Sequence, residues 1–175
     1  MNTSATGGYL TPDNFLVPDD IDLDIIFQGL VKSITGLDGQ YVRPRWQPKP
    51  PKQPLPEANW CAVGVQTVDA DYSLTMPHDE LSAYELLEVS ATFYGPASRG
   101  YAQLLRDGVQ IPQNNEAIRK YGIVYHSFSP IRPCPEYVNE QWIRRHDLMI
   151  YFKRKEIRKY PILDFAESSV KFIGD

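Results

Sequence analysis

The proline-rich stretch RPRWQPKPPKQPLP at residues 43–56 is the feature that most limits how this chain can fold. It holds six prolines in fourteen positions, and such chain favours the extended polyproline II conformation. A linker between two domains would need a core on each side. Only about forty residues with one convincing helix precede the stretch, which is too little chain to bury a core alone. We therefore expect an arm, residues 43–57, that leaves and rejoins a single domain.

Composition supports one soluble globular domain over residues 1–175. Hydrophobic residues make up 42% of the chain and charged residues 23%, as in ordinary globular proteins. The apolar runs are too short to span a bilayer, and the start MNTSATGGYLTP has neither the basic residues nor the hydrophobic stretch of a signal peptide. Cys61 and Cys134 have no CxxC spacing, so we expect free thiols in a reducing compartment.

The N-terminal part predicts an extended arm followed by a helix. Residues 1–18 show little periodicity, and Asp19 or Asp20 can cap a helix that ends at Gly36. Apolar residues recur at the three- and four-residue spacing of one helix face. These are Leu23, Ile26, Phe27, Leu30, Ile34 and Leu37.

Residues 59–175 predict strands with two helices between them. Alternation indicates strands at 59–69, 69–76 and 83–95, with a turn at 76–80. Helices are expected from Ser98, and from Asn114 or Asn115 to Gly122. Further strands are expected at 123–128, 141–155 and 168–173. This order predicts an α+β fold, in which a mixed, mainly antiparallel sheet is flanked by helices on one face.

Charge is unevenly distributed along a chain whose net charge is −4. Residues 1–39 and 56–96 are acidic, whereas the proline-rich arm and residues 144–159 are basic. Such segregation suits contacts between copies of the chain or with a partner. The alternative is that folding interleaves these charges into an ordinary mixed surface.

No chemical motif in the chain predicts catalysis. The three histidines, at positions 78, 126 and 146, lack partners at metal-ligand spacing. Cys134 lies between two prolines, without the helix N-terminus that would activate a thiol. Neither a G-x-S-x-G turn nor a phosphate-binding glycine loop is found. We therefore predict no catalytic, cofactor-binding or metal site. An enzyme would require a deep pocket lined by His146 or Cys134.

The arm has three interpretations. The first is a ligand for a peptide-binding domain, through the P-x-x-P spacing from Pro48 to Pro51. The second is a flexible loop without a binding function, and the third is an arm that lies along a neighbouring subunit. Its length of roughly 40 Å in the polyproline II conformation permits each of these. Trp46 favours subunit contact, because an exposed tryptophan often acts as an interface anchor.

Several longer motifs follow one another along the chain. They are GGYLTP, VRPRWQPKPPKQP followed by WCAVGV, FYGP, YAQLLRDGVQIPQNNEAI, and NEQWIRRHDLMIYFKRKEIRKYP. Together they resemble the neck-terminator family of tailed bacteriophages. The resemblance implies a non-enzymatic virion protein of the neck, assembled in the host cytoplasm. It also implies a ring, usually a hexamer, that caps the tail tube and joins the tail to the head-side connector. The fold implied for such terminators, a mixed sheet flanked by helices, agrees with the α+β prediction.

Under this interpretation the arm and the basic strand are interface elements between copies or with a partner. The residues expected there are Arg43, Arg45, Trp46, Trp60, Trp142, Arg144, Arg145, Arg154, Arg158 and Tyr160. Genomic DNA would pass through the ring without sequence-specific binding, which a net charge of −4 allows. The alternative function is a non-enzymatic adaptor that presents a proline-rich ligand.

Overall fold

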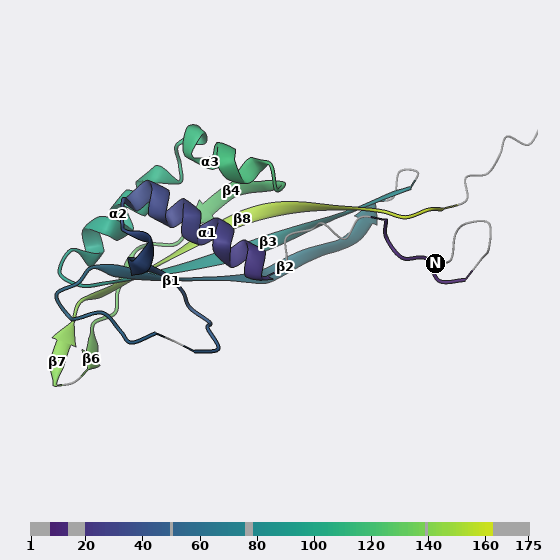
Figure 1. The fold of residues 1–175 in the computed structure, drawn as a ribbon. Coiled ribbons are helices and arrows are strands. Elements are labelled where there is room, and N and C mark those ends of the chain that lie inside the picture. The colour runs from purple at the N-terminus through teal and green to yellow at the C-terminus, as the bar shows by residue number, and fades with distance from the viewer. Residues whose placement is uncertain (1–7, 14–19, 50, 76–78, 139, 163–175) are drawn as a thin grey trace, which may run out of the picture.

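The protein consists of a twisted β-sheet with helices on one of its faces (Figure 1). The structure is a computed structural model that describes residues 8–13, 20–49, 51–75, 79–138 and 140–162. The helices are α1 (Asp20–Thr35), α2 (Ser98–Gly108) and α3 (Pro112–Arg119), with a short 3-10 helix η1 (Gly39–Tyr41) after α1. The strands are β1 (Val42–Pro44), β2 (Trp60–Thr75), β3 (Glu80–Tyr94), β4 (Ile123–Phe128), β5 (Arg132–Pro133), β6 (Glu136–Val138), β7 (Gln141–Ile143) and β8 (Arg145–Lys159).

The main sheet has the strand order β1-β2-β3-β8-β4, and β5 also pairs with β8. Only the β1–β2 pairing in this sheet is parallel. β6 and β7 form a separate two-stranded sheet. These pairings confirm the predicted α+β class with a mixed, mainly antiparallel sheet.

The helix face of the sheet holds the core. The strand predicted at 83–95 corresponds to β3, which starts earlier, at Glu80, and ends at Tyr94; the side that it turns to the core was predicted correctly. Leu87, Val89, Ala91 and Phe93 of β3 are all buried beneath the helices. α1 packs on them through Phe27, whose ring lies 4.9 Å from that of Phe152 on β8. The remaining fully buried large side chains include Leu105, Ile123, Leu148, Ile150, Val31, Val63 and Val109.

α1 begins and ends where the sequence predicted. It starts at Asp20, and Gly36 follows it with a φ of 71°, a conformation that glycine adopts without steric cost. The Gly36 N–H donates to the Lys32 carbonyl at 2.9 Å, as is typical of a helix that ends in a left-handed residue.

Two strand predictions were wrong in their continuity. Residues 59–69 and 69–76 form one strand, β2, rather than two. A register shift between Thr67 and Asp69 breaks the alternation while the pairing with β3 continues, because a β-bulge adds a residue without ending the strand. Conversely, 141–155 is divided at Arg144 between β7 and β8.

The second helix, α2, starts at Ser98 as expected, but the capping role given to Ser98 and the start of the third helix were wrong. The Ser98 side chain does not cap α2; its hydroxyl instead lies 2.9 Å from Nδ1 of His146. α3 starts at Pro112, where a missing N–H costs nothing. Asn114 and Asn115 donate from their side chains to the carbonyls of Gly108 and Val109. They satisfy the C-terminal end of α2 rather than the start of α3. The strand expected at 168–173 lies outside the described residues.

Candidate assembly surfaces

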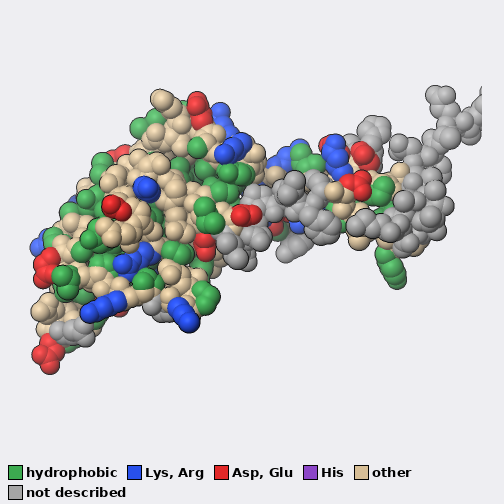
Figure 2. Space-filling view, viewed as in Figure 1, with side chains coloured by type: hydrophobic (Ala, Val, Ile, Leu, Met, Phe, Trp, Pro, Cys, Tyr) green, Lys and Arg blue, Asp and Glu red, His purple; other side chains and the backbone are tan. Residues whose placement is uncertain are grey.

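β2, β3 and β8 continue past the helices as a three-stranded extension of the sheet (Figure 1). β3 and β8 stay paired from Tyr94 with Arg145 to Glu80 with Lys159. Figure 2 shows the extension as a narrow projection from the rounded body, with acidic and basic side chains close together. The extension therefore offers a surface at a distance from the core.

Pairing of acidic β3 with basic β8 brings opposite charges together within the chain. Arg154, with a side chain only 7% exposed, lies 2.6 Å from the Glu85 carboxylate and also pairs with buried Glu156. Arg158 pairs with Glu156, and Lys159 with Glu80. Much of the basic charge predicted to meet a neighbouring subunit thus meets carboxylates of the same chain.

The opposite end of β3 carries a row of stacked aromatic and cationic groups. Trp60 and Tyr94 lie on paired positions of β2 and β3, with ring centroids 4.2 Å apart and nearly parallel planes. Arg43 lies over Trp60 and Arg145 over Tyr94, at 5.9 and 5.7 Å from the ring centroids. Cation–π contacts of this kind are attractive at such distances. The row joins three of the predicted interface residues to one another.

Arg145 is further fixed by two carboxylates. It forms two hydrogen bonds with Asp147, each 2.9 Å long, and lies 3.5 Å from Glu136. Burial acts to raise the pKa of Asp147, but the hydrogen bonds and charge of Arg145, with bonds from Thr92 and Cys134, hold it below its ordinary value. The carboxylate therefore stays ionised, and Arg145 is a structural residue of the main sheet's end.

The first residues of the proline-rich segment lie against the sheet face that the helices leave uncovered. Arg45 donates to the hydroxyl of Thr92 at 2.6 Å and more weakly to that of Ser90. Trp46 lies over Gly64, where an added Cβ would come within 2.8 Å of its ring. Arg43 donates to the carbonyl of Lys52 at 2.8 Å. The segment is thus folded back on its own sheet, with Trp46 still 55% exposed.

We expect Gly64→Ala to displace the Trp46 ring, because the new methyl group would occupy the ring's contact on β2. The expected loss is about 1 kcal/mol of unfolding free energy, at the low end for overpacking, since the exposed ring can move outward. Denaturant unfolding of Gly64→Ala, Trp46→Ala and the double variant measures this. If the contact is the cause, the double variant will be no less stable than Trp46→Ala; additive losses would contradict it.

β6 and β7 form a hairpin that projects from the end of the body opposite the extension (Figure 1). Tyr137 and Trp142 occupy paired positions on it, with ring centroids 5.2 Å apart. Their side chains are 59% and 71% exposed. The sequence interpretation included Trp142 but missed Tyr137. The sequence signal for this pair was that Tyr137 and Trp142 lie at equal distances on either side of Asn139-Glu140, and two residues are the usual length of a β-hairpin loop.

The remaining predicted interface residues are separate from one another. Arg144 is exposed between β7 and β8, and its carbonyl accepts the N–H of Gly95. Tyr160 lies at the far end of the extension, in a shallow apolar site with Leu10, Leu81 and Ile162. The predicted residues therefore form no single surface.

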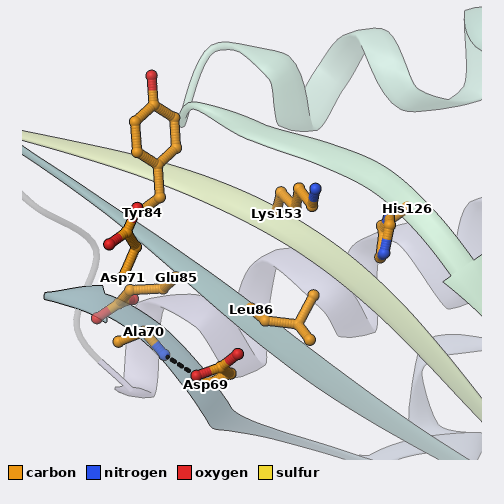
Figure 3. Close-up of a pocket in the computed structure, with 8 residues that line it drawn as sticks. All are labelled: Asp69, Ala70, Asp71, Tyr84, Glu85, Leu86, His126 and Lys153. Atoms are coloured by element: carbon orange, nitrogen blue, oxygen red, sulfur yellow. Dashed lines mark hydrogen bonds between the residues drawn. The ribbon is translucent and has the colours of Figure 1, made fainter. Parts of the chain in front are cut away.

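A hollow lies across strands β2, β3, β8 and β4 (Figure 3). It is lined by Asp69, Ala70, Asp71, Tyr84, Glu85, Leu86, His126 and Lys153. Figure 3 shows these side chains pointing in different directions. Within the described ranges, no three His, Cys, Asp or Glu side chains are grouped as metal ligands.

Cys134 and His146, which sequence reasoning considered for catalysis, interact with other side chains of the fold, whereas His78 lies outside the described residues. Burial raises the pKa of both cysteine thiols; the charge of Asp147 adds to the shift at Cys134. The Ser98 hydroxyl that contacts His146 is fully buried. No described helix has the length and apolar character needed to span a membrane.

His146 gives the fold a predicted acid sensitivity. Burial, with the charges of Arg99 and Arg144, lowers its pKa, and only Asp147 opposes this. The unfolded chain therefore binds this proton more readily, so stability is complete above the ordinary histidine pKa of about 6.5 and falls as the pH decreases below it. Denaturation midpoints at pH 7.5 and 5.5 should decrease less in His146→Gln than in the wild type. An equal decrease would contradict the assignment.

The described part of the chain is a mixed sheet covered by helices on one face, with exposed aromatic and charged side chains at both ends of the sheet. A family model described as phage neck terminator protein matches residues 22–175. The chain therefore belongs to the phage neck terminator family. No curated protein matches the chain.

Family membership establishes the general role. The chain is a structural protein of the bacteriophage neck, a tail terminator located in the virion, and it associates with other phage tail and head proteins. The family is structural and is not known for enzymatic activity.

Proposed function

We propose that the protein forms a ring, of six copies, that caps the tail tube and joins the tail to the head-side connector. The observation that carries the proposal is the family match over most of the chain. The fold supports it, because exposed contact elements lie at opposite ends of the sheet (Figure 1). Contacts between two different surfaces of one chain can close into a ring.

In this ring the part of the proline-rich segment that faces solvent contacts a neighbouring subunit or virion protein. Trp46 and Leu55 are 55% and 72% exposed, and Arg43 and Arg45 fix the start of the segment. These contacts bind the start of the segment to the protein's own body, and no observation among the described residues supports the adaptor function. Genomic DNA passes through the ring, and the chain's net charge of −4 suits passage better than retention.

Electron microscopy of lysates from phage that lack this chain tests the proposed function. We expect filled heads and separate tails, with tail tubes of irregular length, and restoration when the chain is supplied in trans. Supplying Trp46→Ala instead should restore fewer joined particles. Normal joined particles without the chain would contradict the proposal.

A further inference from the structure

The hairpin of β6 and β7 has the features of a preformed contact element. Its base is fixed because Arg145 pairs with both Glu136 and Asp147, and the Cys134 N–H donates to the Arg145 carbonyl at 2.9 Å. Its two exposed rings pack on one another, so little freedom remains to be lost on binding. Tryptophan and tyrosine held in this way are typical centres of protein interfaces.

The tip of the hairpin retains a side chain at a strained position. Glu140 has a φ of 62°, a conformation that glycine adopts readily and most other residues avoid. Such outliers are often found at functional sites. Glu140 gives the tip of the hairpin an acidic residue near its aromatic pair, whereas Glu136 pairs with Arg145 at the base.

A groove between α1 and α3 has the complementary features. Its floor is formed by Leu30 and Ile118, which are almost fully buried, and Ile25 on its edge is 63% exposed. The space over Gly29 is open, since a Cβ built there would meet no atom within 4 Å. Lys120 also lines the groove and provides a positive charge.

We propose that Tyr137 and Trp142 of one copy dock in the α1–α3 groove of the next copy, with Glu140 near Lys120. The apolar pair of the hairpin, next to its acidic tip, thereby meets an apolar groove with a basic edge. Because the hairpin and the groove are different surfaces of the same chain, the contact is heterologous and repeats from copy to copy. This inference rests on the proposed ring and specifies one of its subunit contacts.

Two substitutions separate docking from folding. Trp142→Ala should weaken self-association about thirtyfold, as for a central interface residue. Glu140→Gly should also weaken it, yet leave the unfolding midpoint unchanged or higher, because glycine relieves the strained φ. Glu140→Lys combined with Lys120→Glu should recover association lost in either single variant.

Cysteine cross-linking tests the geometry directly, in a Cys134→Ser background where the remaining Cys61 is buried. A mixture of Glu140→Cys and Gly29→Cys proteins should form covalent dimers under oxidation, and a chain with both cysteines should form a ladder of multimers. Gln66→Cys, exposed on the other face of the sheet, replaces Gly29→Cys as the matched control.

The outcomes distinguish this inference from the proposed function. Rings that persist in Trp142→Ala, with no cross-linking above the Gln66→Cys control, would overturn the docking and leave the ring intact. If Trp142→Ala leaves the rings intact but blocks the joining of heads to tails, the hairpin contacts another virion protein and the proposed docking between copies is wrong. A wild-type chain that is monomeric alone and on tail tubes would overturn both.

Discussion

Arg154→Met is expected to lower the free energy of unfolding by about 3 to 5 kcal/mol, the usual cost of removing one partner from a buried ion pair. Arg154 is the cation between Glu85 and Glu156, and its side chain and that of Glu156 are each only 7% exposed. Methionine fills similar space but leaves the Glu156 carboxylate poorly compensated. Urea unfolding at neutral pH measures the loss.

Arg158→Met is the matched control, because Arg158 pairs with the same Glu156 but is 46% exposed. Exposed ion pairs contribute at most about 1 kcal/mol, so this variant should remain close to the wild type. Adding Glu156→Gln to Arg154→Met should recover part of the loss by removing the buried charge. Equal effects of the two arginine substitutions would show that burial does not decide the stability of the extension.

Phe27→Ala is expected to cost about 3 to 5 kcal/mol, as for other large aromatic residues removed from a core. Phe27 is fully buried and joins α1 to the sheet through Phe152. The cavity would lie between the helix layer and the central strands, where neighbouring side chains have little freedom to fill it. Thermal and denaturant unfolding measure the effect.

Ile25→Ala, on the same helix, is the control for Phe27→Ala. Ile25 is 63% exposed, so its truncation should change stability by less than about 0.5 kcal/mol. If Ile25 lines the proposed docking groove, the same variant should weaken self-association. A large stability loss for Ile25→Ala would mean that α1 packs differently from the arrangement described here.

The parts of the fold that sequence predicted well are those with one clear period. α1 and β3 each place their buried apolar residues on one face, so the spacing of Phe27 and Leu30, or of Leu87 and Val89, indicated both the element and its core side. The β-bulge after Thr67 interrupts the period without ending β2, so one strand was interpreted as two. The start of α3 was missed because asparagine is a common helix cap, whereas Asn114 and Asn115 bond to carbonyls at the end of the preceding helix.

The candidate surfaces depend on long-range pairing, which one sequence does not reveal. Acidic and basic segments were visible, but the register of β3 with β8 decides that Glu85 meets Arg154 in the same chain. Trp60 and Arg145 were predicted as interface residues because the arm and the basic strand were interpreted as interface elements. The register places Tyr94 between them and gives both a structural role. Tyr137 became significant only as the partner of Trp142 on a projecting hairpin.

The mass of the purified protein in solution, by light scattering after size exclusion with negative-stain images of the same peak, tests the central claim most directly. The proposed function predicts rings of about six copies of the 20.0 kDa chain, formed alone or on addition of tail tubes. A mass of one chain under both conditions, with no ring at the tube end, would contradict it.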